Sequence, residues 1–125
     1  MTIFETLAKF DALIPNDYTI AEKIGWLSEL DGLIKTEIID THEGGEDIVF
    51  TGYDENIDQV GTVLLVPAPY EDIYMKWLEA KVNYANAEYN KYNNSVTAYN
   101  AVHSAYERYY NRNHIPISKK KRFIF

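Results

Sequence analysis

The chain has 125 residues, of which 46% are hydrophobic, and a formal net charge of -7. A chain of this length usually forms one domain, and it has enough apolar residues for a core, which argues against wholesale disorder. It contains no cysteine, which excludes disulfide scaffolds, thiol catalysis and zinc sites built on thiolates. The acidic balance argues against a surface that wraps nucleic acid throughout, and we expect a single domain over 1–125.

The charge is divided unevenly along the chain. Residues 1–72 hold sixteen acids and three lysines, a formal charge of −13, whereas residues 73–125 carry +6. Two interpretations remain open. Either the two halves attract each other inside one fold, or copies associate head to tail, acidic surface to basic surface, as complementary potentials favour.

No segment of the sequence predicts export or membrane insertion. The first ten residues have no basic leader followed by an apolar run, and no stretch approaches the roughly 18 apolar residues of a spanning helix. We expect the protein to be made and used in the cytoplasm, or in a particle assembled there.

Residues 2–13 are predicted to form the first helix. Thr2 followed by Glu5 is typical of a capping box, in which each side chain accepts a hydrogen bond from the other residue's backbone N–H. Pro15 ends the pattern.

The second predicted helix spans about 19–40. Thr19 and Glu22 form another capping box at its start. Gly25 and Gly32 lie inside it and could either permit close approach of another helix or simply be tolerated. Apolar residues recur at spacings of three and four, which is the period of a helix face: Ile20, Ile24, Leu27, Leu30, Ile34 and Ile38.

The segment 41–69 predicts an irregular arm. It is rich in acids and punctuated by glycines, and its two short apolar runs, 48–50 and 63–66, are each bounded by turn residues. These runs could pair as a short β-hairpin or lie as extended arms.

Two further helices are predicted at about 70–92 and 95–112. Between them, 93–95 (Asn-Asn-Ser) is typical of the turn of a helical hairpin, with Asn94 or Ser95 as the next N-cap. An extended tail is predicted at 115–125. The fold class is therefore mainly α: a small helical bundle with a long C-terminal helical hairpin, an irregular or short β-hairpin middle segment and an extended tail.

Few residues have the pattern of a catalytic or metal site. His42 stands in an acidic stretch without a standard ligand spacing, and the acids from Asp54 lack the glycine and glutamate of a calcium loop. His103 falls on the tyrosine-rich face of its helix, where a packed, hydrogen-bonded role is expected. Phosphate loops and nucleophile elbows are absent from the sequence. We therefore predict no catalytic residue, no metal, no cofactor and no enzyme activity.

The tyrosines are more informative. Nine of the eleven fall between Tyr70 and Tyr110. Tyrosine combines a large apolar ring with a polar tip, so it suits both a partly buried core and a surface that becomes buried in a partner. Both interpretations stay open, and the candidate protein-interaction residues are Tyr70, Tyr74, Trp77, Tyr84, Tyr89, Tyr92, Tyr99 and Tyr106.

The segment 118–125 also has two interpretations. Its bases could contact DNA phosphate or an acidic partner. Its apolar residues could add as a strand to another protein or fill an apolar pocket there, which we favour over a disordered end. The candidate residues are Lys119, Lys120, Lys121 and Arg122 for charge, and Phe123, Ile124 and Phe125 for the apolar contact.

Four segments resemble a family of small structural proteins of tailed bacteriophages and prophages of Gram-positive hosts. They are LLVPAPYEDIY (64–74), WLEAKVNYANAEYNKYNNS (77–95), YYNRNHIP (109–116) and WLSELDG (26–32). The family is similar to the head–tail connector, or adaptor, class. The resemblance implies a small, mostly helical subunit that forms a ring beneath the portal, helps to close the packaged head and seats the tail.

The resemblance also implies the partners and the location. The partners are the chain's own copies in a homo-oligomeric ring, the portal protein and other connector or tail-completion proteins, with DNA only as passing cargo and no membrane. The location is the virion, assembled in the bacterial host cytoplasm. The alternative function is a small nucleic-acid-binding or DNA-packaging accessory protein that uses the basic segment at 119–122.

Overall fold

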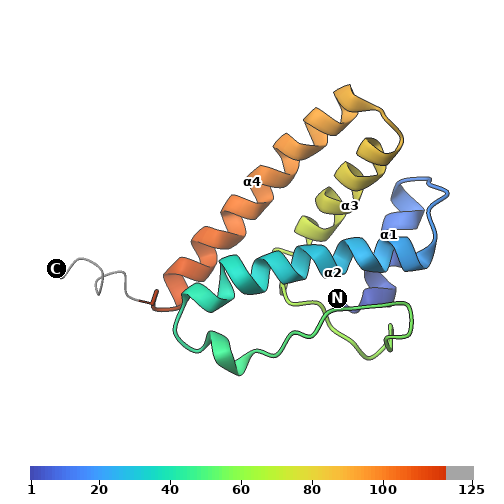
Figure 1. Ribbon diagram of the computed structural model, residues 1–125. Coiled ribbons are helices and arrows are strands. Elements are labelled where there is room, and N and C mark those ends of the chain that lie inside the picture. Colours follow the sequence, from blue (N-terminus) through green and yellow to red (C-terminus); the bar gives the residue numbers. More distant parts are fainter. Residues whose placement is uncertain (118–125) are drawn as a thin grey trace.

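The computed structural model describes residues 1–117, and positions 118–125 fall outside the described part. The fold is mainly helical, as predicted (Figure 1). It contains α1 (Ile3–Leu13), α2 (Ile20–Glu37), α3 (Asp72–Ala85) and α4 (Tyr89–Asn113), with two short 3-10 turns, η1 (Ile39–Thr41) and η2 (Gly45–Asp47).

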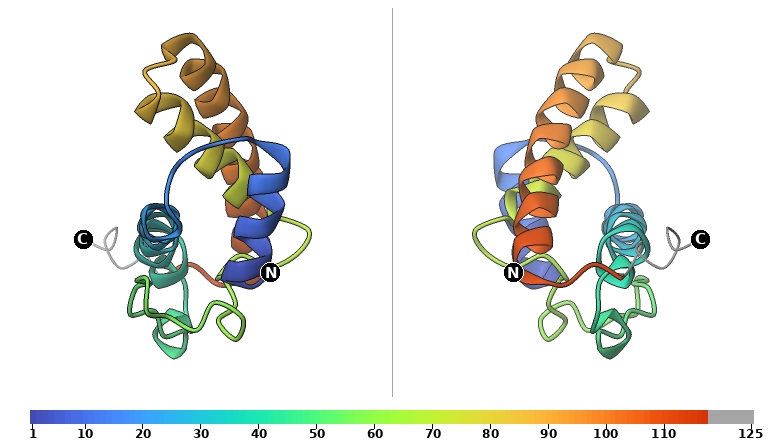
Figure 2. Two further views of the ribbon diagram at one scale, coloured as in Figure 1. Left: turned by 90° about the vertical axis from the view of Figure 1, so that its right-hand side faces the viewer. Right: turned by 90° about the vertical axis from the view of Figure 1, so that its left-hand side faces the viewer.

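The two long C-terminal helices determine the shape. α3 and α4 run antiparallel as a hairpin, and α1 and α2 both contact α3 (Figure 1). The turn between α3 and α4 projects away from the rest of the molecule, and the segment between α2 and α3 passes below the helices (Figure 2). None of the helices in the described residues is long and apolar enough to cross a bilayer.

Both predicted capping boxes are confirmed. The Thr2 hydroxyl accepts from the Glu5 backbone N–H at 3.1 Å, and the Glu5 carboxylate accepts from the Thr2 N–H at 2.9 Å. Thr19 and Glu22 make the same pair of bonds at 3.1 and 3.0 Å. These backbone hydrogen bonds lower the pKa of each glutamate, because they favour the charged form.

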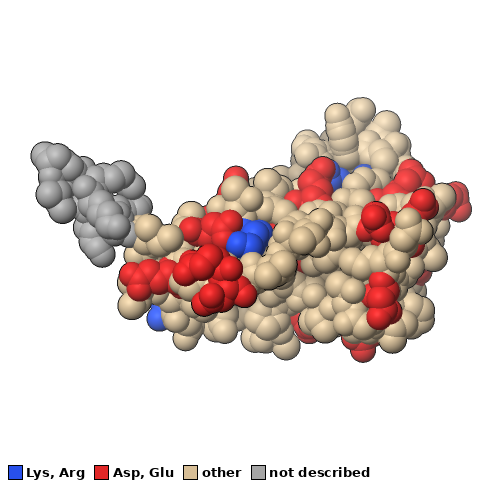
Figure 3. All heavy atoms as spheres, turned by 60° about the horizontal axis from the view of Figure 1, so that its bottom comes forward, with Lys and Arg blue, Asp and Glu red and all other residues tan. Residues whose placement is uncertain are grey.

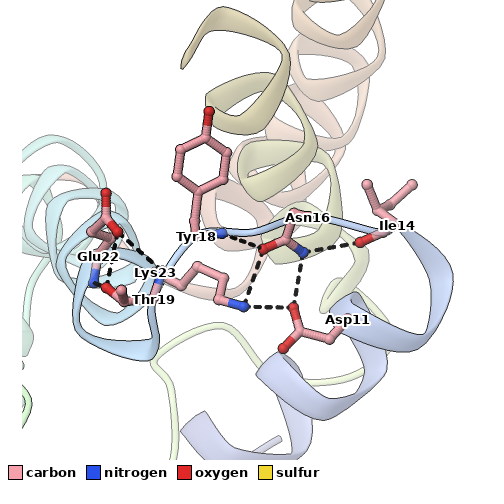
Figure 4. Close-up of polar contacts among 7 residues, drawn as sticks. All are labelled: Asp11, Ile14, Asn16, Tyr18, Thr19, Glu22 and Lys23. Carbon is pink, nitrogen blue, oxygen red and sulfur yellow. Dashed lines mark hydrogen bonds and ion pairs between the residues drawn. The ribbon is translucent and has the colours of Figure 1, made fainter. Parts of the chain in front are cut away.

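A buried lysine joins the end of α1 to the start of α2 (Figure 4). Lys23 is only 4% exposed, and its ammonium group donates to Asp11 at 2.7 Å and to the amide oxygen of Asn16 at 3.2 Å. Burial raises the pKa of Asp11, but the hydrogen bonds from Lys23 and Asn16 outweigh it, so the pKa is lowered overall. This ion pair fixes the direction in which the chain leaves α1 and enters α2.

The predicted position of the hairpin turn is wrong. α3 ends at Ala85, so the predicted helix 70–92 is too long, and the turn falls at 86–88 rather than 93–95. The Ala87 N–H bonds to the Tyr84 carbonyl at 3.0 Å and the Glu88 N–H to that of Asn83 at 2.9 Å. This is a Schellman motif, with Ala87 in the left-handed conformation at φ 57°.

The asparagine-rich stretch continues the helix because one of its residues has a partner inside the hairpin. Ser95 is buried, and its hydroxyl accepts from the Asn83 side chain at 2.7 Å and donates to the Lys91 carbonyl at 2.8 Å. A side chain bonded across the hairpin in this way stabilises helix at 93–95 despite a composition typical of turns.

Replacing Ala87 by glycine is expected to stabilise the protein by about 0.5–1 kcal/mol, because glycine adopts a positive φ without the steric cost of a Cβ. Chemical denaturation should give a higher midpoint with an unchanged slope. Ala85→Gly, inside the last turn of α3, is the matched control and should destabilise by a similar amount. A lower midpoint for Ala87→Gly would contradict the assigned turn.

The core lies where α1, α2 and the base of the α3–α4 hairpin meet. The apolar stripe predicted for the second helix supplies much of it, although Ile20 at the start of that helix is exposed. The fully buried large side chains are Ile3, Phe10, Ile24, Leu27, Leu30, Ile34, Ile38, Ile39, Ile73, Tyr74, Leu78 and Tyr106.

The middle segment is irregular, and the alternative of a short β-hairpin is wrong. Within residues 1–117 the only bridges are the isolated pairs Thr2–Val63 and His42–Pro116. Leu64 and Val66 are instead buried against the helices. The N–H groups of Leu65 and Val66 bond to the side chains of Asp31 and Tyr74, so the run 63–66 does not pair with the run 48–50.

The glycines of α2 do not mark a helix–helix contact. A Cβ at Gly25 would have no atom within 4 Å, and a Cβ at Gly32 would make an ordinary 3.6 Å contact with the Phe50 ring. The observations favour the second sequence interpretation, in which both glycines are simply tolerated.

Replacing Gly25 by alanine is expected to raise the free energy of unfolding by about 0.5–1 kcal/mol, since alanine is the better helix former and the site is open. Thermal unfolding should show a higher midpoint. An unchanged or lower midpoint would mean that this part of α2 is not helical in solution.

Candidate interaction surface

A groove with a volume of about 670 Å³ lies between α2 and the outer part of the hairpin. We call it the aromatic groove. α2 contributes one residue to it, and α3 and α4 contribute the rest. Its lining residues are Trp26, Trp77, Ala80, Lys81, Tyr84, Ala85, Tyr92, Val96, Tyr99 and Asn100.

Helical spacing explains why these residues meet. On α3, residues 77, 81 and 84 are four and three positions apart, which places them on one face. On α4, residues 92, 96 and 99 have the same spacing. Because the two helices are antiparallel, the two rows face each other across the hairpin.

Contacts among the rings hold the groove in shape. Trp77 packs on Tyr99 with centroids 5.2 Å apart, and Tyr84 packs on Tyr92 at 5.1 Å. The Trp77 indole N–H donates to the Trp26 carbonyl oxygen at 2.8 Å, which links α3 to α2. The groove is therefore pre-formed by contacts within the chain, as binding sites usually are.

Charged side chains lie along one side of the groove. The Lys81 ammonium lies 4.8 Å from the centroid of the Trp77 ring and pairs with Glu29 of α2. Burial raises the pKa of Tyr99 to about 12, and the nearby carboxylate of Glu37 adds to the shift. The Glu29 carboxylate of α2 therefore lies at the edge of the groove, where it pairs with Lys81.

The outer end of the groove is open. Tyr84 is 53% exposed, and Tyr89, which packs beside it at 5.9 Å, is 58% exposed. Neighbouring exposed aromatic side chains of this kind mark interaction sites more often than scattered apolar residues do. The arrangement is suited to binding apolar, aromatic or cationic groups.

The structure divides the predicted interaction residues into two groups. Five of them line the groove or lie beside it: Trp77, Tyr84, Tyr89, Tyr92 and Tyr99. Tyr74 and Tyr106 lie inside the core, so their assignment to an interaction surface is corrected. Tyr70 is half-buried and packs against Tyr109 at 4.7 Å.

Tyr74 belongs to a buried polar network around Asp31, which is 0% exposed. The carboxylate accepts from the Tyr74 hydroxyl at 2.7 Å, the Tyr53 hydroxyl at 2.5 Å and the Leu65 N–H at 3.0 Å. Burial raises the pKa of Asp31, whereas the three hydrogen bonds oppose the rise. The hydrogen bonds of this network connect the middle segment to α2 and α3.

Acids gather on the face formed by the middle segment, shown in Figure 3. They include Asp40, Glu43, Glu46 and Asp47, all exposed. The described residues include no group of three or more histidine, aspartate or glutamate side chains that could hold a metal ion together. His42 is buried instead, with its ring 2.6 Å from the Ile38 carbonyl oxygen and 2.7 Å from the Asn111 side chain.

The described part of the chain ends before the predicted contact residues of the last segment. Lys119, Lys120, Lys121, Arg122, Phe123, Ile124 and Phe125 lie outside the described residues. Four of the nine bases that give 73–125 its positive charge are in this group. The charge contrast within the described part is therefore smaller than the whole sequence suggests.

Sequence reasoning missed two parts of the site and the buried acid. Trp26 and Lys81 line the groove, and neither was singled out; the repeated spacing of 77, 81 and 84 was the available signal. Asp31 was counted only as a charge. Its position beside Leu27, Leu30 and Ile34 on one helix face was a signal that it is buried.

A comparison with family models, curated proteins and solved structures gives no match for this chain.

Proposed function

We propose that this chain is a non-enzymatic assembly protein, a connector subunit that forms a ring under the portal of a tailed bacteriophage. The observation that supports an assembly role best is the open aromatic groove on the outer hairpin. The connector class itself rests on the sequence resemblance of 26–32, 64–74, 77–95 and 109–116.

The surface features suit contacts between unlike faces of identical subunits. A ring needs one patch of each copy to meet a different patch of the next. The aromatic groove lies on the hairpin, and the acidic face lies on the middle segment, so the two patches are distinct. Such an arrangement favours a heterologous interface over a self-complementary one.

The groove is suited to binding rather than to acid–base chemistry. Its ionisable lining residues are Lys81, held by Glu29, and tyrosines, of which Tyr99 has a pKa of about 12. A general acid or base works best with a pKa near the operating pH, and a tyrosine with so high a pKa stays neutral there.

The proposal includes partners and a location. The partners are the chain's own copies, the portal and other connector or tail-completion proteins, and DNA passes the ring as cargo. The location is the virion, assembled in the host cytoplasm. An acidic subunit suits a channel through which DNA must pass without binding tightly.

The test is light scattering of the full chain, alone and with the portal protein of the same phage, over a concentration series. A ring-sized complex is the expected result, at least with the portal present. A chain that stays monomeric with the portal, yet binds duplex DNA with affinity that falls steeply with salt, would instead support the nucleic-acid-binding alternative.

A further inference from the structure

Residues 48–57, which we call the strap, lie along α2 with few contacts. They belong to the segment that passes below the helices in Figure 2. None of the strap residues is buried, and Val49 is 80% exposed. Among the described residues, the backbone of 49–53 makes one hydrogen bond, from the Tyr53 N–H to the Ser28 hydroxyl at 3.0 Å. A segment with so few backbone partners belongs to the least stable part of a fold.

Two aromatic side chains hold the strap on α2. The Tyr53 hydroxyl donates to Asp31 at 2.5 Å, in addition to the bond that the Tyr53 backbone makes with α2. The Phe50 ring lies over Gly32, where an added Cβ would be 3.6 Å from it. The two rings also pack against each other, with centroids 5.1 Å apart. The closed position of the strap therefore depends mainly on these two residues.

The chain on either side of the strap is fixed more firmly. On one side, Gly45 is buried, and its carbonyl accepts from Lys35 at 3.1 Å. On the other side, the N–H groups of Ile3 and Phe4 bond to backbone carbonyls of 59–62 at 3.1 and 3.0 Å. The strap can therefore leave α2 between two fixed points while the rest of the fold keeps its contacts.

Charge opposes the closed position of the strap. Positions 36–75 contain ten acids and neither lysine nor arginine. The fully buried carboxylate of Asp31 lies beneath the strap. Five acids lie in or beside the strap and take part in no ion pair among the described residues: Glu46, Asp47, Asp54, Glu55 and Asp58. Because salt screens repulsion between exposed charges, low salt should favour the open position.

Covering Asp31 also has a desolvation cost. Burial raises the pKa of Asp31, and the titratable side chains that face it are Tyr53, Tyr74 of α3 and Tyr106 of α4, none of them a base. A buried charge without an oppositely charged partner is costly. When Tyr53 leaves, water can reach the carboxylate, while Tyr74 and the Leu65 N–H keep their bonds to it. Hydration of Asp31 therefore offsets part of the energy lost on opening.

We propose that the strap opens from α2 as a unit while the rest of the protein stays folded, and that opening exposes Asp31 and the covered parts of the Phe50 and Tyr53 rings. The closed strap keeps these groups from contact with other molecules. The open strap presents two aromatic side chains on an acidic arm. Opening is a property of the single chain, so it is independent of the proposed ring.

Native-state hydrogen exchange, measured at single amides by NMR, tests the opening in the unmodified protein. The Tyr53 N–H should be protected, but about a hundredfold less than the N–H of Ile34 in the core part of α2. Low concentrations of urea should leave exchange at Tyr53 nearly unchanged, because a local opening exposes little surface. The same urea should speed up exchange at Ile34, which requires a larger unfolding.

Variants of the strap test which contacts hold it closed. Tyr53→Phe removes the hydroxyl that bonds to Asp31 and should speed up exchange at position 53 about five- to tenfold. Phe50→Leu weakens the contact at Gly32 and should act in the same direction. Val49→Ala, at an exposed position of the strap, is the matched control and should leave the rate unchanged. Raising the salt concentration from about 0.05 to about 0.5 M should slow exchange at position 53.

Three results would overturn the proposal. Equal protection of Tyr53 and Ile34, with the same response to urea, would mean that the strap leaves α2 only when the whole protein unfolds. A complete lack of protection at Tyr53 would mean that the strap does not occupy the closed position. Unchanged exchange at position 53 in both Tyr53→Phe and Phe50→Leu would mean that these rings do not hold the strap closed.

Discussion

Replacing Asp31 by asparagine is expected to lower the free energy of unfolding by about 3 kcal/mol, because it removes a fully buried charge acceptor. Three donors converge on this carboxylate: the hydroxyls of Tyr53 and Tyr74 and the N–H of Leu65. The asparagine side chain keeps one acceptor oxygen, but its NH₂ group cannot accept a hydrogen bond, so at least one of the three donors loses its partner. With a total stability of about 5–15 kcal/mol for a small domain, the loss should be visible in urea denaturation.

Two tyrosine variants locate the effect within the network. Tyr74→Phe should cost more than Tyr53→Phe, because the Tyr74 hydroxyl also accepts from the Val66 N–H at 2.8 Å and is buried. Tyr53 is only half-buried, and water can take the place of its hydroxyl. Equal effects of the two variants would contradict the central position assigned to Tyr74.

The pH dependence of the Asp31→Asn effect has a defined sign. The pKa of Asp31 is raised above its ordinary 3.8, chiefly by burial, so the folded state binds this proton more tightly than the unfolded state. The contribution of Asp31 to the free energy of unfolding is largest below pH 3.8, and it is lost as the pH rises through the pKa that Asp31 has in the folded state. The stability deficit of Asp31→Asn should therefore shrink as pH rises through that range, in denaturation curves measured at stepwise pH.

Replacing Gly45 by alanine is expected to cost about 2–3 kcal/mol, because the added Cβ meets backbone atoms. It would clash with the Ile39 carbonyl oxygen and lie 3.1 Å from the Asp40 Cα. Gly45 is buried, and its carbonyl accepts from Lys35 at 3.1 Å, so η1 and η2 cannot move apart freely. Thermal unfolding should show a lower midpoint.

The neighbouring glycine is the control. A Cβ at Gly44 meets no atom within 4 Å, and only its φ of +86° opposes alanine, so Gly44→Ala should cost about 1 kcal/mol. Because η1 and η2 support the backbone that bonds to 115–117, hydrogen exchange at Ile117 should also speed up in Gly45→Ala. If Gly44→Ala is the more damaging change, the close approach at Gly45 is wrong.

Local sequence patterns predicted the structure correctly where both partners of a hydrogen bond lie within a few residues of each other. Thr2 with Glu5 and Thr19 with Glu22 begin helices because each pair satisfies its own backbone groups. The same signals failed at 93–95, where turn-forming residues continue α4 because Ser95 has a partner in Asn83, on another helix. A pattern within one segment holds no information about a partner twelve positions away.

The candidate site was likewise predicted from the sequence only in part. The tyrosines between Tyr70 and Tyr110 were identified by composition, but their burial in the structure differs from one residue to the next. Tyr74 faces Asp31 in the core, whereas Tyr84, ten residues later, lies open on the outer hairpin. The face of α3 on which each tyrosine lies determines whether it is buried or exposed. The groove itself forms only where α4 and Trp26 of α2 pack against α3.

By itself, the sequence determined the helical class, the starts of the first two helices and the acidic first half of the chain. Those features depend on residue type and on spacing within a few turns. Only the tertiary structure decided where α3 ends, which tyrosines are exposed, and that Asp31 holds the middle segment in place. Each of these depends on contacts between residues distant in sequence, and such contacts are fixed only when the helices pack together.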